Sequence, residues 1–273
     1  TCGIGAFVRA ALESFPNSLR ILGFDLNCTH ADKARAAAAE VSTQVSVEIY
    51  ERDFFQTDWN RIVEDLPQPV LILGNPPWVT NSSLGMVGGQ NLPPKSNFQN
   101  HKGFAAKTGK ANFDISEWML IKTLETLGKH HACLAMLCKT ATARKVLRHA
   151  WLNHFPIGRA TIHSFDAQEH FNVSVDACLL IVHTGIMEIS SVATVYGDIS
   201  FNKKISTIGL YGKELVANVD EFHRLRDLDG LSYYTWRSGV KHDAARVMEL
   251  TSAGSSFRNG SGESISLEPT HLY

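Results

Sequence analysis

Apolar and polar positions follow two different periods along the chain, and stretches with one period alternate with stretches with the other. Short runs rich in Val, Ile, Leu and Phe have the length and composition of strands. Longer stretches with apolar residues three and four positions apart predict amphipathic helices between them. This order is typical of an α/β protein whose strands are joined by crossover helices. The expected strands cover residues 20–26, 45–50, 70–73, 132–138, 160–165 and 176–183.

Capping signals and apolar faces give the expected helices. An Ala-rich helix follows the first strand, with Thr29 and Asp32 as its capping signal. Gly128 is expected to end a helix over 114–127, and a further helix covers 142–153. The apolar faces are formed by Val8, Leu12 and Phe15 in the first helix and by Leu120, Leu124 and Leu127 in the helix over 114–127.

Polar residues stand where the expected strands end. Asp25 closes the first strand, Asp53 follows the second and Asn75 follows the third. Parallel strands present their carboxyl ends at one edge of a sheet, and α/β proteins bind ligands at that edge. We therefore expect these side chains to form one site together with the glycine loop around Gly3.

The segment from Asn75 through Pro76 and Pro77 to Trp78 carries the clearest chemistry. The Asn75 side chain offers a carbonyl acceptor, and the prolines stiffen the backbone so that a main-chain carbonyl can lie beside it. Two such acceptors would hold both hydrogens of an exocyclic amine, and Trp78 supplies a stacking face. This pattern indicates transfer to an amino group. The same residues also make ordinary tight turns, so the segment by itself leaves both interpretations open.

The expected ligand residues nearer the start of the chain have structural alternatives as well. Gly3 and Gly5 let a ligand approach the backbone closely, or they let helices pack. Asp25 lies about 20 positions after the glycines, where nucleoside-binding folds place a ribose acceptor, although a strand-terminal Asp can also cap a helix. Asp53 and Phe54 suit the amino group and face of an adenine, or they anchor a loop through buried Phe.

Taken together, these residues resemble the S-adenosylmethionine-dependent amino-methyltransferases, and most closely the gamma-type DNA adenine-N6 methyltransferases of restriction-modification systems. The glycine motif, the ribose acid, the Asp-Phe pair and the Asn-Pro-Pro-aromatic tetrapeptide occur in the order of that family. Phe113 to Trp118 resembles the family's next motif, and Phe171 to Asp176 resembles the segment whose aromatic ring packs on the extruded base.

The resemblance implies a fold, a reaction and a set of site residues. The fold is a Rossmann-like methyltransferase fold, with a mostly parallel sheet and helices on both of its faces. The reaction is methyl transfer from S-adenosylmethionine to N6 of an adenine flipped out of double-stranded DNA. The catalytic residues implied are Asn75, Pro76, Pro77 and Trp78; the cofactor contacts are Thr1, Gly3, Gly5, Asp25, Leu26, Asp53, Phe54 and Asn75; the target base would lie against Trp78 and Phe171.

One departure from the family pattern affects the fold. The family's glycine motif begins with an acidic residue and a proline after a central strand, and this chain starts beyond them. We therefore expect the chain to lack the first strand of the fold, which weakens the expected cofactor affinity.

Composition suggests one main domain with an appendage. The chain has 273 residues, of which 44% are hydrophobic, and a net charge of −1. We expect a catalytic domain over 1–219 and the truncated start of a target-recognition domain, or a C-terminal extension, over 220–273. Between Leu66 and Phe113 there is no acidic residue, so we expect an insertion over 79–113 to contact DNA or to be a surface loop. Its basic residues are Lys95, Lys102, Lys107 and Lys110.

Cysteines and histidines suggest no metal chemistry. None of the 5 cysteines or 12 histidines has the spacing of a metal site, and buried thiols are expected. The sequence contains no signal peptide and no apolar run of about 18 residues, so a cytoplasmic protein with no membrane contact is expected. A restriction endonuclease subunit or domain is the protein partner implied by the resemblance.

Two other functions fit the same motifs. Methyltransferases acting on protein glutamine or on RNA bases share Asn-Pro-Pro-aromatic tetrapeptides. A non-catalytic DNA-binding fragment would keep the fold without binding cofactor. The insertion and the C-terminal segment favour DNA over the first alternative, and a cofactor-binding measurement separates the second from both enzymes.

Overall fold

The computed structural model describes residues 1–41, 44–79, 114–185, 188–228, 230, 233–235, 249–254 and 256–266. The chain forms two compact units, Thr1–Arg226 and Asp227–Tyr273, and each is treated by itself.

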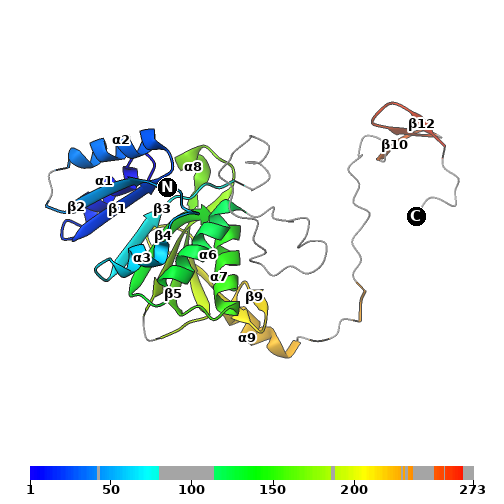
Figure 1. The fold of residues 1–273 in the computed structure, drawn as a ribbon. Helices are drawn as coiled ribbons and strands as arrows, with labels where there is room; N and C mark the ends of the chain where they lie inside the picture. Colours follow the sequence, from blue (N-terminus) through cyan, green and yellow to red (C-terminus); the bar gives the residue numbers. More distant parts are fainter. Residues whose placement is uncertain are drawn as a thin grey trace. The chain divides into compact units, whose positions relative to one another are not determined.

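The first part of the larger unit alternates helices and strands as the apolar pattern predicts (Figure 1). Strands β1 and β2 pair in parallel, with Gly23 opposite Ile49, and form a two-stranded sheet. The elements are α1 (Ala6–Ser14), β1 (Arg20–Asp25), α2 (Cys28–Ala39), β2 (Ser46–Glu51), α3 (Trp59–Glu64) and β3 (Val70–Gly74).

The remaining strands of this unit join β3 in a seven-stranded sheet with the order β3-β4-β6-β5-β7-β8-β9. In the described chain, five of these seven strands run in one direction, whereas β6 and β8 run against them. The elements are α6 (Ile115–Leu127), β4 (Ala132–Lys139), α7 (Thr140–Leu152), β5 (Ile157–Asp166), α8 (Ala167–Phe171), β6 (Asp176–Thr184), β7 (Val192–Tyr196), β8 (Lys204–Tyr211), β9 (Glu214–Val216), α9 (Val219–Leu225) and a 3₁₀ turn (Arg226–Leu228).

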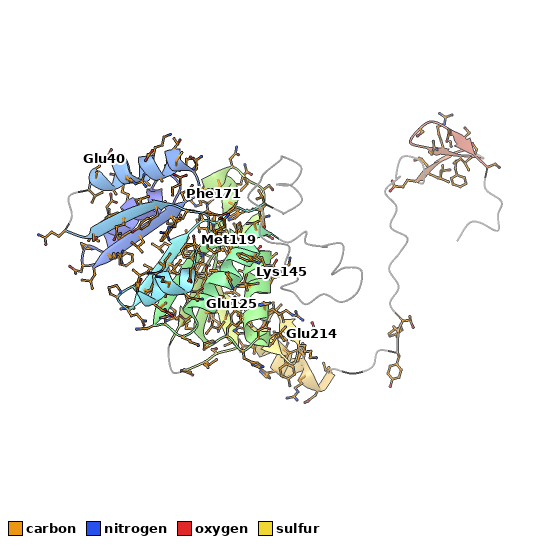
Figure 2. All side chains as sticks on the ribbon, in the orientation of Figure 1. Glu40, Met119, Glu125, Lys145, Phe171 and Glu214 are labelled. Atoms are coloured by element: carbon orange, nitrogen blue, oxygen red, sulfur yellow. The ribbon has the colours of Figure 1, made fainter. Side chains whose placement is uncertain are left out.

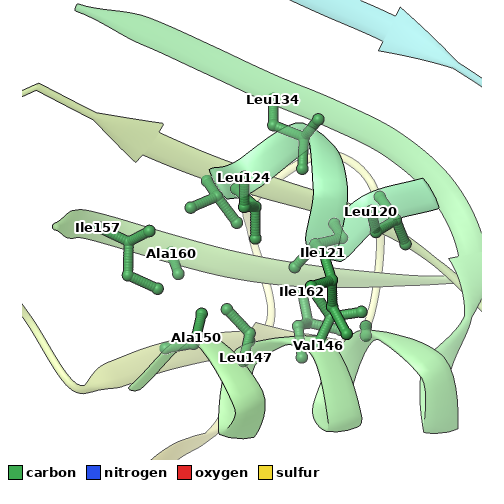
Figure 3. Close-up of a cluster of buried hydrophobic side chains, with 14 of the residues drawn as sticks. Leu120, Ile121, Leu124, Leu134, Val146, Leu147, Ala150, Ile157, Ala160 and Ile162 are labelled. Carbon is green, nitrogen blue, oxygen red and sulfur yellow. The ribbon is translucent and has the colours of Figure 1, made fainter. Parts of the chain in front are cut away.

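The main core lies between helices α6 and α7 and the middle of the seven-stranded sheet. Leu120 and Leu124 of α6 and Leu147 of α7 are almost fully buried there. Figure 3 shows these side chains in one cluster with Ile157 and Ile162 of β5. The predicted leucine face of α6 is therefore confirmed. Burying each such side chain stabilises the fold by about 1.5–3 kcal/mol, which makes this sheet a firm base for the loops at its edge.

A second, smaller core joins α1 and α2 to the two-stranded sheet, with Val8, Leu12 and Ala34 buried in it. Two expectations about these helices were wrong. Phe15 is 47% exposed, because α1 ends at Ser14 and Phe15 follows it with a non-helical backbone. The cap of α2 is Asn27, whose side chain accepts from the backbone N–H of His30, whereas Thr29 already lies inside the helix.

Between β1 and β3 lies a cavity of about 890 Å³. Residues of both strands line it, including Gly23 of β1 and Leu71 and Leu73 of β3. Among the described residues, β1 pairs only with β2 and β3 only with β4, so the edges that border the cavity have no strand partner. Thr1, Cys2 and Pro76 also line it, whereas Asp25, Asp53 and Asn75 do not.

The smaller unit contains a three-stranded antiparallel sheet of β10 (Leu250–Ala253), β11 (Ser256–Asn259) and β12 (Ser264–Ile265). The turn after β11 is held by the Asn259 side-chain carbonyl, which accepts from the backbone N–H groups of Ser261 and Glu263. Such an Asx turn closes a hairpin without a large core.

Candidate active site

The predicted site residues lie at or just beyond the carboxyl ends of β1, β2 and β3, although β3 belongs to a different sheet from β1 and β2. Asp25 is the last residue of β1, and Asn75 follows the last residue of β3. The start of the chain is tied to the same edge, because the amine of Thr1 and the backbone N–H of Cys2 both donate to the Phe24 carbonyl, at 2.6 and 2.7 Å.

Asn75 has an unused acceptor. Its side-chain Oδ1 is buried and has no hydrogen-bond partner among the described residues. A buried carbonyl without a donor costs about 1–3 kcal/mol of stability, so such atoms in native proteins call for a reason. Here the atom stands at the end of β3 beside the buried Pro76. The arrangement leaves a ready acceptor for a ligand N–H.

Trp78 is fixed by β4. Its indole Nε1 donates to the Leu137 carbonyl at 3.3 Å, which sets the plane of the ring. The Phe171 ring of α8 lies 5.7 Å away at an interplanar angle of 69°. The structure thus brings together two aromatic residues that are 93 positions apart in the sequence, and Figure 2 shows Phe171 at this edge.

The two rings do not form a ready-made sandwich. A base between two parallel rings needs centroids about 7–8 Å apart, twice the contact distance of carbon atoms. The observed edge-to-face contact is shorter than that. Phe171 is partly exposed and sits on a helix of five residues, so a small rotation of its side chain would open the space.

The two glycines of the first loop have different environments. Gly5 has φ 95° and caps α1, and a Cβ there would lie 2.8 Å from the Cα of Ala34 in α2. Gly5 therefore satisfies helix packing. Gly3 has φ 57°, and a Cβ there would meet no described atom within 4 Å. The open side of Gly3 is the part of this loop that a ligand can approach.

Asp25 holds the glycine loop against β1. One carboxylate oxygen accepts from the backbone N–H of Gly3 at 2.9 Å, and the other accepts from the N–H of Asn27 at 3.0 Å. His30 Nδ1 lies 3.6 Å away. A carboxylate has about four acceptor positions, so Asp25 keeps capacity for ligand hydroxyls while it orders the loop.

Asp53 and Phe54 form a tight turn after β2. The Asp53 carboxylate accepts from the backbone N–H of Phe55 at 2.8 Å and from the side chain of Gln56 at 3.0 Å. The Phe54 carbonyl accepts from the Trp59 indole at 2.8 Å, and the Phe54 ring packs against Trp59. Phe54 therefore anchors this loop, as the structural alternative for these residues predicted, and the Asp53 carboxylate is partly exposed beside it.

An ion pair that sequence reasoning missed braces the tetrapeptide. Asp114 caps α6, is almost fully buried, and lies 2.7 Å from the amine of Lys139 at the end of β4. The backbone N–H of Ile115 donates to the Val79 carbonyl at 3.0 Å. The residue after Trp78 is thereby joined to α6. Asp114 and Lys139 are 25 positions apart, so the sequence indicated only that a helix begins at Asp114.

Comparison with known proteins bears on this geometry. No family model matches the chain. The type II methyltransferase M.NspV of Nostoc sp. is 39% identical over 274 residues. This chain is homologous to a type II methyltransferase. The alignment covers 100% of this chain and 57% of M.NspV, so the chain spans little more than half the length of its homologue.

Solved structures of restriction-modification proteins are also similar in part. The type IIL restriction-modification enzyme MmeI, solved in complex with DNA, has a TM-score of 0.48 at 15% identity, covering 80% of this chain and 34% of MmeI. A type I methyltransferase subunit from Streptococcus thermophilus has a TM-score of 0.43 at 15% identity, covering 83% of this chain and 45% of the subunit.

Other expected features fall outside the site or outside the described residues. Lys95, Lys102, Lys107 and Lys110 lie outside the described residues, so their contact with DNA stays a prediction. Leu26 is half-exposed next to Asp25. Within the described ranges there is no group of metal-ligating side chains and no helix long and apolar enough to cross a membrane.

Proposed function

We propose that this protein is a DNA methyltransferase that transfers a methyl group from S-adenosylmethionine to N6 of an adenine flipped out of the duplex, as part of a restriction-modification system. The observation that carries the proposal is the buried Oδ1 of Asn75, which has no hydrogen-bond partner among the residues that the structure describes. The amine N–H of a bound adenine is the donor that this acceptor fits. Homology to a type II methyltransferase supports the same reaction class.

The residues at the strand ends fit the cofactor. The open side of Gly3 admits a backbone contact, and Asp25 retains acceptor positions for ribose hydroxyls. Asp53 and Phe54 would take the adenine moiety, with Leu26 covering its face and Thr1 at the rim. S-adenosylmethionine supplies, when bound, a methyl group activated by its sulfonium.

The chain's own residues prepare the acceptor. Asn75 Oδ1 and the Pro76 carbonyl each accept a hydrogen bond from one N–H of the amine. These two bonds turn the nitrogen lone pair out of the ring's π-system. Trp78, oriented by its bond to Leu137, holds one face of the base, and Phe171 holds the other. The adenine must leave the helix because its amine is paired inside the duplex. Positioning and fixed dipoles then supply the acceleration without a strong base.

We also propose that the cavity between β1 and β3 is the place of a further parallel strand of the same fold. Its apolar lining and the two unpartnered strand edges support this proposal. Such a strand would end beside Gly3 and would stiffen the cofactor loop. DNA is the proposed partner, with a restriction endonuclease subunit or domain acting at the same sites in the cytoplasm.

Asn75→Ala tests the function. We expect this change to lower the rate of adenine methylation by about 10²–10³, the usual effect of removing one preorganised hydrogen-bonding group. Cofactor affinity and fold should be retained, because the packing comes from the apolar body of β3. The measurement is mass spectrometry of duplex DNA after incubation with labelled cofactor.

Trp78 supplies a matched pair of controls. Trp78→Ala should weaken capture of the flipped base by about 1–3 kcal/mol, whereas Trp78→Phe keeps a stacking face and much of the activity. A methyl group found on a protein glutamine or on RNA would refute the DNA proposal. Failure of S-adenosylhomocysteine to bind in calorimetry would instead favour the non-catalytic DNA-binding function.

A further inference from the structure

A loop outside the predicted site lies on the same sheet edge as Asn75. Strands β3, β4, β5 and β7 run in one direction, so their carboxyl ends share an edge. The loop over 197–203 follows β7 at that edge and leads into β8. Strand β7 is four positions from β3 in the sheet order, which corresponds to about 19 Å at 4.7–4.9 Å per strand.

Phe201, in this loop, is held in an unfavourable state. Its φ is 63°, in the left-handed region that bulky residues avoid, and it is 48% exposed. A non-glycine residue in this region costs about 1–3 kcal/mol, and exposing an aromatic ring forgoes burial. Two unfavourable features at one residue are typical of functional positions.

The surroundings of Phe201 hold the ring in place. Its centroid lies 4.1 Å from that of His163, and His163 stacks on Tyr196 at 4.8 Å with an interplanar angle of 2°. His163 is fully buried, and its Nε2 lies 2.8 Å from the Thr161 hydroxyl. The exposed ring therefore rests on a fixed aromatic base at the ends of β5 and β7.

The loop over 197–204 contains one acidic and two basic residues. The Asp198 carboxylate accepts from the backbone N–H of Ser200 at 3.0 Å and from that of Asn202 at 3.3 Å, so the acid is used within the loop. Lys203 and Lys204 are exposed, and neither forms an ion pair within the part of the chain that the structure describes. A flat apolar ring beside two free cations complements bases and phosphates.

We propose that the loop over 197–204 is a second DNA contact, in which Phe201 stacks against a base or sugar of the duplex and Lys203 and Lys204 bind phosphates. The proposal rests on the proposed function, since it takes DNA as the partner. At 3.4 Å per base pair, 19 Å places the contact about five to six steps from the flipped adenine. Ile199 and Ile205 are also exposed and would suit a protein partner, so that occupant is an outcome of the test.

Fluorescence anisotropy with random-sequence duplex DNA of about 30 base pairs, long enough to span both contacts, measures the effect with the full chain. Phe201→Ala should weaken binding about five- to a hundredfold, the effect of losing one stacked base. The matched control is Ile199→Ala, because Ile199 lies in the same loop and is 50% exposed. This control should bind as the wild type does. Replacing Lys203 and Lys204 by Gln should reduce the slope of log affinity against log salt by about 1.8, which is 0.9 for each phosphate contact.

Phe201→Asn separates function from folding. Asn adopts the left-handed conformation readily, so this variant should unfold at the same or a higher denaturant concentration while it loses DNA affinity. If Phe201 had a purely structural role, this variant would unfold at a lower denaturant concentration and would keep its DNA affinity. Unchanged DNA affinity in Phe201→Ala and Phe201→Asn overturns the inference and assigns the exposed face to a protein partner.

The two proposals fail in different ways. If Phe201→Ala binds DNA normally while Asn75→Ala abolishes methylation, the loop assignment falls and the proposed function stands. If Phe201→Ala loses DNA affinity while no adenine is methylated by the wild type, the reaction falls and the DNA contact stands. A wild-type chain that does not bind duplex DNA overturns both.

Discussion

At the scale of single residues, the candidate site combines an acceptor without a partner among the described residues with acceptors that already hold their own loops. Asn75 Oδ1 has no hydrogen-bond partner within the part of the chain that the structure describes, whereas the Asp53 carboxylate accepts bonds from its own turn. The same contrast separates the two glycines. Gly5 is required because α2 packs against it, and Gly3 faces open space. One motif thus serves helix packing at Gly5 and leaves room for a Cβ at Gly3, which is the room that the proposed cofactor contact needs.

We predict that Gly5→Ala lowers the free energy of unfolding by about 1–3 kcal/mol, since the new Cβ meets the backbone of Ala34 at 2.8 Å and φ is 95°. Gly3→Ala is the control. It meets no described atom within 4 Å, so only the positive φ of 57° costs stability, about 1 kcal/mol. Urea unfolding of the two variants measures the difference. Equal losses would show that Gly5 has no special packing role.

At the scale of elements, strand pairing decides which parts of the sheet are firm. Strands β4 and β6 have neighbours on both sides and carry fully buried residues such as Leu134 and Leu180. Strands β1 and β3 border the cavity, and each has a partner on one side only among the described residues. Unpaired backbone groups open easily to water.

Hydrogen exchange followed by mass spectrometry should show this difference. We predict that amides of β1 (20–25) and β3 (70–74) exchange at least about tenfold faster than amides of β4 (132–139) and β6 (176–184). A difference of about 1.4 kcal/mol in the free energy of local opening corresponds to this factor of ten. A strand bound in the cavity would slow exchange at the first two segments. Equal protection of β3 and β4 would contradict an open strand position.

At the scale of the whole molecule, burial of neutral histidines links the stability of the larger unit to pH. Burial lowers the pKa of His149, His163 and His183 below the ordinary value of 6.5. For His183, Arg159 and His131 lower the pKa further. Burial at all three positions, with Arg159 close to His163 and His183, therefore favours the neutral imidazole in the folded state.

The sign of the pH effect follows from proton uptake. Below about pH 6.5 the unfolded chain binds protons at these histidines while the folded chain does not, so the free energy of unfolding falls as the pH is lowered. We predict lower stability at pH 5.5 than at pH 7.5 in guanidinium unfolding. His163→Phe keeps a ring beside Tyr196 and takes up no proton, so its stability should depend less on pH. Equal pH dependence of the variant and the wild type would refute the role of His163.

The sequence by itself determined the order of elements and the strand ends at which the candidate site residues lie. Apolar periodicity predicted β1, β3, β4, α6 and α7 to within about two residues, because burial on one face or both imposes a pattern that the chain displays locally. The tetrapeptide at Asn75 was readable for the same reason, since its prolines and amide are contiguous.

The tertiary structure alone decided what depends on residues far apart in the chain. The antiparallel pairing of β6 with β4 and β5 is set by strand register. Three side-chain contacts join residues that are 25 to 93 positions apart: the Asp114–Lys139 ion pair, the contact of Trp78 with Phe171 and the support of Phe201 by His163. Asn27 displaced Thr29 as the cap of α2 because the backbone turns earlier than the sequence signal suggested. Local patterns specify which faces are buried, whereas the partners of those faces are fixed only when the sheet assembles.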